Sequence, residues 1–293
     1  MICPSQNGRY IMRPWVTALS YSGGTGSTAI LWAVLLGELA RPQNFIVINA
    51  DPGMEGRRVY EHVAMMEREC VAAGIPFIRV KRDLYAEILA LKASGATRFD
   101  NPPFWTLNRE TGSVGQLMQK CTKTYKIAEM DRAVRVWMSE NIGVPMNNQR
   151  LGSDSVNRWI GFTADEVHRI KEDRKEFEVC NYPLVEMGID RANLPGLFLR
   201  WGKPMPPRSV CRACFANDVS FFKGMHDDEP ADFEQACKVD DEIRDLSCIG
   251  IADECYVSSV CIPLRVLAAN GFNLTAAQKE QDAVRCHSGH CFT

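Results

Sequence analysis

The chain has 293 residues, a formal net charge of −2 and a hydrophobic fraction of 46%. These values are ordinary for a globular protein and exclude an overall basic field that would attract nucleic acid. No apolar run reaches the roughly 18 residues that a membrane-spanning helix needs, so we expect no membrane partner. The first residues lack the charged-then-apolar pattern of a secretory signal, which leads us to expect a cytoplasmic protein. In that compartment the twelve cysteines predict metal binding or thiol chemistry more than disulfides.

The first part of the chain alternates strand and helix patterns. Continuous apolar runs predict buried strands over 15–21, 44–51 and 76–80. Helical periodicity between them predicts helices over 27–40, with Ser27 near the N-cap, and over 56–74. Such alternation requires right-handed crossovers and predicts an α/β fold, a Rossmann-like, doubly wound parallel sheet.

The second part is less regular. Residues 94–118 predict a long irregular segment, and such a length points to function. Further expectations in chain order are a helix over 125–140, a strand over 157–163, a helix over 164–176, an extended segment over 182–187, a helix over 189–202 and a helix over 229–246. We therefore expect an α/β domain over 1–205 and a Cys-rich, mainly helical region over 206–293.

A glycine- and hydroxyl-rich stretch, SGGTGST, joins the first strand to the first helix. Glycines let the backbone approach an anion, and the N–H groups at a helix start favour negative charge. The stretch is not a Walker A loop, because no Lys follows its last glycine. It predicts phosphate binding by Ser22, Gly23, Gly24, Ser27 and Thr28; the alternative is a glycine-rich turn without a ligand.

Six stretches together resemble one known family. SYSGGTGSTA resembles the PP-loop, usually S-G-G-x-D-S, with Gly26 in place of the aspartate. The stretches NADPGMEGRRVYEHV, KCTKTYKIAEM, GFTADEVHRIK, YPLVEMGIDR and PPRSVCRAC follow in the same order as similar segments of that family. Over residues 15–245 the chain thus resembles the PP-loop adenine nucleotide α-hydrolase superfamily, in its phosphoadenosine phosphosulfate reductase-like branch of phage and actinobacterial type.

The resemblance implies binding of ATP or a related adenine nucleotide, and cleavage of ATP to AMP and pyrophosphate to adenylate a substrate for sulfur transfer. A runner-up activity is reduction of an adenylyl sulfate by a thiol near the C-terminus. The resemblance also implies that Asp51 contacts ribose or base, and that Asp165 and Glu166 hold Mg²⁺ or orient the substrate. For the last two, the alternative is a solvated helix start, where acidic residues are favoured. Because Gly26 replaces the aspartate, a binding regulator without turnover is a further alternative.

Cysteines supply the remaining candidate site. Cys211 and Cys214 form a C-x-x-C pair, and the resemblance adds Cys121 as a third ligand, a set that suits a [4Fe–4S] cluster with one open iron. One alternative is a Zn²⁺ site that joins the pair to Cys286 and Cys291, with His287 and His290 as substitutes. Another makes Cys286 or Cys291 a nucleophilic thiol in a mobile tail, with Cys291 as the expected catalytic residue, and a last one has no metal.

The expected partners are a small-molecule or nucleic-acid base substrate and a sulfur donor. The sequence names neither the substrate nor the oligomeric state.

Overall fold

The structure is a computed structural model that describes residues 3–4, 10–11, 15–95, 104–118, 120–144, 155–170 and 175–283. The chain divides into two compact units, each made of separate segments. Unit 1 comprises Met1–Ala50, Arg58–Val80 and Glu129–Ser209, and unit 2 comprises Asp51–Arg57, Lys81–Ala128 and Val210–Thr293. The chain therefore passes between the units more than once. A single domain boundary between 205 and 206 stays a prediction.

Unit 1 is built on a five-stranded sheet with the strand order β5-β4-β3-β8-β9. Its strands are β3 (Val16–Ser20), β4 (Phe45–Asp51), β5 (Phe77–Lys81), β8 (Val156–Trp159) and β9 (Glu178–Asn181). The pairs β3–β4, β3–β8 and β8–β9 are parallel. The predicted α/β fold with a Rossmann-like, largely parallel sheet is confirmed.

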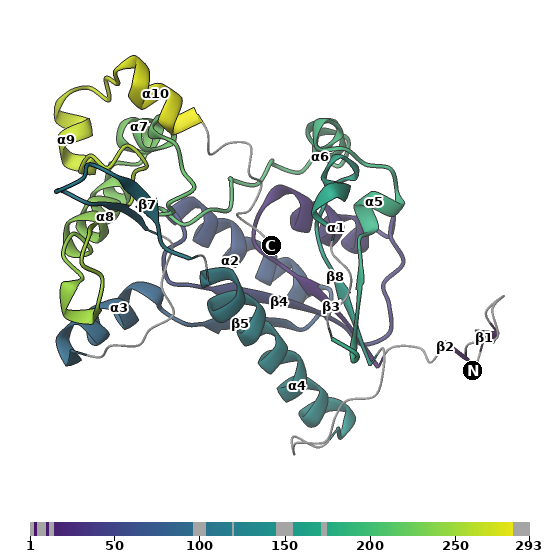
Figure 1. The fold of residues 1–293 in the computed structure, drawn as a ribbon. Helices are drawn as coiled ribbons and strands as arrows, with labels where there is room; N and C mark the ends of the chain where they lie inside the picture. Colours follow the sequence, from purple (N-terminus) through teal and green to yellow (C-terminus); the bar gives the residue numbers. More distant parts are fainter. Residues whose placement is uncertain are drawn as a thin grey trace. The chain divides into compact units, whose positions relative to one another are not determined.

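Helices cover both faces of this sheet (Figure 1). One face packs against α1 (Thr25–Leu35), α2 (Arg57–Ala72), α5 (Pro183–Glu186) and α6 (Leu194–Arg200). The other packs against α4 (Ala128–Ile142). Alternate residues of one strand serve the two faces, as the pleat requires: Leu19 contributes to the first core and Ala18 to the second.

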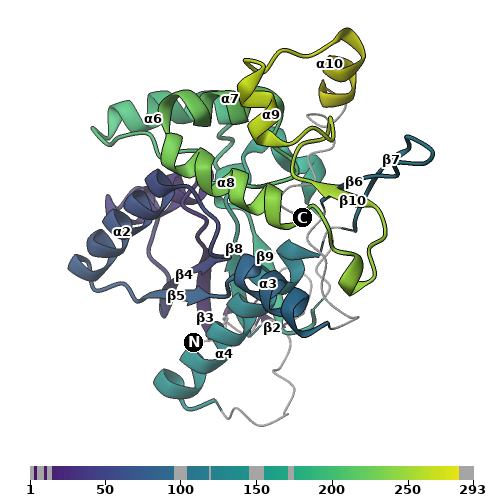
Figure 2. The ribbon, with the colours of Figure 1, turned by 90° about the vertical axis from the view of Figure 1, so that its left-hand side faces the viewer.

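Unit 2 combines a small sheet with helices, and its C-terminal part is helical as predicted. The sheet is antiparallel with the order β10-β6-β7, from β6 (Trp105–Leu107), β7 (Val114–Gln116) and β10 (Glu254–Tyr256). The helices are α3 (Leu84–Ser94), α7 (Val219–Asp228), α8 (Pro230–Glu242), α9 (Leu264–Ala269) and α10 (Ala276–Ala283). Figure 2 shows α7, α8 and α9 side by side, in line with their mutual contacts.

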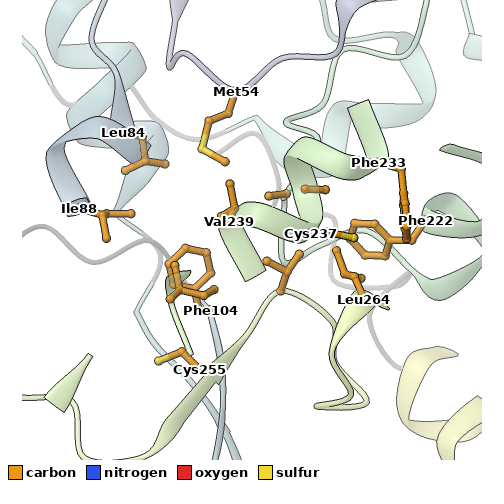
Figure 3. Packing of buried hydrophobic residues seen from close by; sticks show 14 of the residues in the cluster. Met54, Leu84, Ile88, Phe104, Phe222, Phe233, Cys237, Val239, Cys255 and Leu264 are labelled. Atoms are coloured by element: carbon orange, nitrogen blue, oxygen red, sulfur yellow. The ribbon is translucent and has the colours of Figure 1, made fainter. Parts of the chain in front are cut away.

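The core of unit 2 draws on all three of its chain segments. Met54, Phe104 and Val239, one from each segment, belong to one buried apolar cluster (Figure 3). Cys237 and Cys255 are completely buried in it. These two cysteines act as small apolar core residues.

Several expected elements differ from the structure. The first strand, second strand, third strand and the helix over 56–74 are confirmed, with bounds shifted by one or two residues. The irregular segment 94–118 contains the β6–β7 hairpin, whose strands have only three residues each. Residues 182–187 were expected to be extended but form α5, because Pro183 occupies the first turn of a helix. Within the helix expected over 164–176, Ala164–Arg169 form a 3₁₀ turn, and residues 171–174 lie outside the described residues.

Candidate functional site

The glycine-rich loop lies at the carboxyl end of β3, the middle strand of the unit 1 sheet. The chain leaves β3 through α1 to β4 on one side, while β8 pairs with β3 on the other. The strand order thus changes direction between β3 and β8. In open α/β sheets, ligands bind at the carboxyl ends of the strands at such a point. The loop therefore has the position that a binding site in this fold requires.

Hydroxyl groups hold the loop in shape. Ser22 Oγ lies 3.3 Å from Ser27 Oγ and accepts a hydrogen bond of 3.2 Å from the N–H of Gly24. Ser27 Oγ accepts from the N–H of Ser22 at 3.3 Å. Ser209, from the end of unit 1, donates to the carbonyl of Ser22 at 2.7 Å. The two predicted serines therefore form part of the loop's own scaffold.

Glycine is present at positions 23 and 24 for two different structural reasons. Gly23 has a φ of +78°, and a β-carbon there would lie 2.9 Å from a methyl group of Val63. Gly24 is the N-cap of α1. Because glycine has no side chain, the helix start has no side-chain capping hydrogen bond. The prediction of Ser27 near the N-cap is wrong, because α1 begins at Thr25 and Ser27 lies inside its first turn. The N–H groups of that turn are the ones that an anion would meet.

Gly26 is explained by a close backbone approach. A β-carbon at position 26 would overlap the carbonyl oxygen of Gly161, in the loop that follows β8. A β-carbon at Gly161 would in turn overlap the backbone at Ser27. The loops after β3 and β8 are therefore packed backbone to backbone, and no side chain fits at position 26. The resemblance offered no reason for this departure from the family pattern.

Thr28 points into the interior of unit 1. It is completely buried, and its hydroxyl lies 3.1 Å from the hydroxyl of Tyr21 and 3.2 Å from Nε2 of His62. Burial lowers the pKa of His62 to about 4, so the imidazole is neutral at pH 7. Burial likewise raises the pKa of Tyr21. The side chain of Thr28 thus forms part of a buried polar chain, and direct contact of its hydroxyl with phosphate stays a prediction.

The acidic pair after β8 takes part in a charged turn. The carboxylate of Glu166 accepts hydrogen bonds from the hydroxyl of Thr163 at 2.9 Å and from Arg191 at 2.6 Å, and it also pairs with Arg169. Asp165 is exposed and accepts from the N–H of Arg191 at 2.9 Å. Although burial opposes it, these hydrogen bonds and the arginine charges lower the pKa of Glu166. A role for the pair in holding Mg²⁺ stays a prediction.

Asp51 lies at the end of β4 and at the beginning of the first segment of unit 2. Its carboxylate accepts a 2.7 Å hydrogen bond from the N–H of Gly53, whose φ is +79°. This short-range bond shapes the turn that leads to Glu55. Contact of Asp51 with ribose or base stays a prediction.

The three predicted metal-binding cysteines all lie in unit 2. Cys211 and Cys214 form a tight turn, closed by a 3.0 Å hydrogen bond from the N–H of Cys214 to the carbonyl of Cys211. Cys121 caps a π-helical turn over Thr122–Ile127. Burial raises the pKa of the Cys211 thiol well above its usual value, and the charges of Glu55, Cys214 and Cys121 add to that effect. Cys121 and Cys211 both pack against the buried apolar cluster of unit 2.

A buried ion pair accompanies the thiols. Lys126 Nζ lies 3.3 Å from Oε1 of Glu55, and the backbone of Glu55 forms an isolated β-bridge with Cys211. Burial by itself would lower the pKa of Lys126, but the negative charges of Glu55 and the cysteines raise it. The donor set fits an iron–sulfur centre in kind, since thiolates are its usual ligands. Among the described residues, however, no three His, Cys, Asp or Glu side chains are arranged to hold a metal ion.

Some expectations fall outside the described residues. Cys286, His287, His290 and Cys291 all lie beyond residue 283, so the zinc site that needs them and the catalytic role of Cys291 stay predictions. In the part of the chain that the structure describes, no helix combines the length and the apolarity that crossing a membrane demands.

Sequence reasoning missed two residues of the loop's surroundings. His62 was visible as a lone polar residue on the buried face of the helix over 56–74, among Val59, Val63 and Met66. Its contact with Thr28 depends on tertiary packing, which no local pattern encodes. In the sequence, Gly161 lay inside the strand expected over 157–163, whereas the structure ends β8 at Trp159.

The chain is therefore an α/β protein of the doubly wound type, with a glycine-rich loop at the switch point of its sheet. No protein-family model matches it, and a search of curated proteins finds no match. Among solved structures, the chain is similar to the U34-tRNA thiolase NcsA from Methanococcus maripaludis with its [4Fe-4S] cluster. The sequence identity is 15%, the match covers 91% of this chain and 85% of that chain, and the TM-score is 0.40.

Proposed function

We propose that the chain is a PP-loop enzyme that binds ATP at the Ser22–Thr28 loop and cleaves it to AMP and pyrophosphate, thereby adenylating a substrate. One observation carries this proposal: the first turn of α1 has no side-chain cap and starts at the carboxyl end of the middle strand. Free N–H groups there, together with the helix dipole, favour phosphate. The loop lacks the lysine of a Walker A motif, which fits α–β cleavage better than transfer of the terminal phosphate.

The chemistry assigned to the loop is electrostatic. An oxygen of the substrate attacks the α-phosphorus of ATP, the α–β bridge bond breaks, and pyrophosphate leaves with its charge. Preorganised N–H donors stabilise the charge that develops on the leaving group. A second nucleophile then displaces AMP from the substrate carbon or phosphorus. Mg²⁺, held by carboxylates such as Asp165, would neutralise phosphate charge as it does in other nucleotide enzymes.

Sulfur transfer is the finer part of the proposal. It is supported by Cys121, Cys211 and Cys214, which all lie in unit 2, where Cys121 and Cys211 pack against the same apolar cluster. With these thiolates as ligands, a [4Fe–4S] cluster would leave one iron free to bind an anionic sulfur species. The substrate is then an oxygen-bearing small molecule or nucleic-acid base, and the second nucleophile is sulfur from a donor.

Product analysis with α-labelled ATP tests the proposed cleavage. We expect AMP and pyrophosphate from the wild-type chain. The substitution Gly24→Val should abolish ATP binding in calorimetry, because a β-carbon there would lie 3.3 Å from both Ser209 and Ser22, and a larger side chain would displace the loop that presents the N–H groups. Gly23→Val is a poorer test, since the positive φ and the Val63 contact would strain the fold itself.

Gly196→Val provides the matched control. Gly196 lies in α6 of the same unit, and a β-carbon there would meet nothing within 4 Å. Its ATP affinity should equal that of the wild type. Unchanged affinity in Gly24→Val would contradict the proposal. Sustained binding with neither AMP nor ADP produced would instead favour a binding regulator, and sulfite release from an adenylyl sulfate would favour the reductase.

Anaerobic purification with iron and sulfide analysis tests the thiol part separately. We expect four irons and four acid-labile sulfides per chain, as a [4Fe–4S] cluster contains. Both should be lost in the triple variant of Cys121, Cys211 and Cys214 to Ser. The same three changes at Cys70, Cys180 and Cys237, which are spread over both units, should leave the iron content unchanged. Bound zinc without iron would contradict the cluster.

A further inference from the structure

A chain of three buried polar side chains lies directly beneath the glycine-rich loop. Tyr21 is the residue before the loop, and Thr28 is its last residue. Their hydroxyl oxygens lie 3.1 Å apart, so this contact joins the two ends of the loop. His62 of α2 extends the chain, with Nε2 at 3.2 Å from the hydroxyl of Thr28.

All three side chains are removed from solvent. Tyr21 is 1% exposed, Thr28 is 0% exposed and His62 is 8% exposed. A buried polar group without a partner is costly, so breaking one contact of such a chain penalises the whole arrangement. The chain is therefore a specific determinant of the loop's closed geometry.

The same face of α2 supports the loop from below. Val59 and Val63, which flank His62 on that face, fill the space where a β-carbon of Gly23 would lie. His62 is thus the polar member of an otherwise apolar support. It is the residue through which α2 fixes both ends of the loop.

We propose that His62 is a positioning residue for nucleotide binding, acting through Thr28 and Tyr21 to hold the Ser22–Thr28 loop in its binding conformation before the nucleotide arrives. This inference rests on the proposed function of the loop. His62 does not touch the nucleotide; it lowers the conformational entropy that binding would otherwise have to remove. Preorganisation of this kind increases affinity without adding a contact to the ligand.

Amide hydrogen exchange of the full chain without nucleotide is the direct test. In His62→Leu and in Thr28→Val, exchange of the loop amides between 22 and 28 should become faster than in the wild type. His62→Gln should restore slow exchange, because its amide can replace the Nε2 contact. Exchange at wild-type rates in both disruptive variants would overturn the proposal, since the loop would then keep its conformation without the chain.

Calorimetric titration with MgATP supplies the second readout. Each disruptive variant should bind about tenfold more weakly, which corresponds to the loss of one buried hydrogen bond. The double variant should bind no more weakly than either single variant, because both break the same chain. Thr17→Val removes another buried threonine of unit 1, from β3, and should leave the affinity unchanged.

The outcomes separate the two proposals. If the wild type binds ATP and the His62 and Thr28 variants bind it equally well, the positioning role is wrong and the proposed function stands. If the effects of the two single variants multiply in the double variant, the residues act independently and the chain is not a unit. If the wild type binds no ATP at all, the proposed function and this role fail together.

Discussion

At the scale of single residues, Gly26 shows that one added carbon atom can decide whether a substitution is tolerated. Replacing a glycine inside a helix by alanine normally stabilises the protein, by up to about 1 kcal/mol. Gly26 lies in the first turn of α1, yet its β-carbon would overlap the carbonyl of Gly161. At this position, replacement by alanine should therefore destabilise the protein.

We expect Gly26→Ala to lower the free energy of unfolding by about 1–3 kcal/mol, the usual cost of forcing an extra carbon into a packed site. Gly26→Asp, which restores the family pattern, should cost at least as much. Urea unfolding of the full chain measures both. Gly196→Ala in α6, where the added carbon meets nothing, should be neutral or stabilising. A stabilised Gly26→Ala variant would show that the two loops can separate freely.

His62 makes the stability of the chain depend on pH. Its pKa is about 4 in the folded state, against an ordinary value of 6.5, because burial disfavours the charged form. The stabilisation is therefore complete above pH 6.5 and is lost as the pH falls towards 4, since the unfolded state binds the proton first. Between pH 7 and pH 5, the free energy of unfolding of the wild type should fall by at most about 2 kcal/mol more than that of the His62→Gln variant. Equal losses of the wild type and His62→Gln in urea unfolding would show that His62 binds its proton as readily in the fold as in the unfolded chain.

At the scale of elements, the Cys211–Cys214 turn differs chemically from the exposed thiol of Cys248 in the same unit. Burial and nearby negative charge raise the pKa of Cys211, whereas Cys248 is exposed. Only the thiolate reacts with iodoacetamide. In the metal-free protein at pH 8, we expect Cys248 to be alkylated first and Cys211 much later.

Time-resolved alkylation with peptide mass analysis measures this order. Unfolding in urea should abolish the difference, because both thiols are then exposed to solvent. Alkylation of Cys211 before Cys248 in the folded chain would mean that the turn opens readily to solvent.

The sequence was most informative where elements are long and apolar. The buried strands over 16–20 and 45–51 are visible as continuous apolar runs, and the helix Arg57–Ala72 as a periodic pattern. Short elements escaped prediction. The strands of the β6–β7 hairpin have three residues each, too few for an alternation to be recognised, and their partner β10 lies far along the chain.

The candidate site, too, could be predicted from the sequence only in part. The loop's position after a buried strand and its glycines are local properties, and they could be read from the sequence. The contacts of Gly26 with Gly161 and of Thr28 with His62 join residues that are distant in the chain. They depend on how the loops and helices pack, so a single sequence cannot reveal them.

At the scale of the whole molecule, the two units cannot be separated by one cut. A chain that ends at residue 205 would lose α7, α8 and β10, while the segment with Leu84, Ile88 and Phe104 would remain with its apolar side chains uncovered. We expect such a truncation to aggregate or to bind a hydrophobic dye. A chain that ends at residue 283 keeps every helix and strand that the structure describes and should behave as the wild type.

Gel filtration, dye fluorescence and thermal unfolding compare the two truncations. A monomeric 1–205 chain that unfolds cooperatively and binds no dye would contradict the expectation, and would support a domain boundary at that point.

The pairing of β6 with β10 also sets an order of events on the ribosome. Leu107 is paired with Glu254, roughly 150 residues later in the chain. At synthesis rates of about 5–20 residues per second, β6 and β7 emerge many seconds before their partner exists. The last segment of unit 1 ends at Ser209, so unit 1 can form while unit 2 still waits for its last segment. During that interval the nascent chain presents an unpaired strand edge, and a chaperone that recognises such edges would find its binding site in residues 104–118.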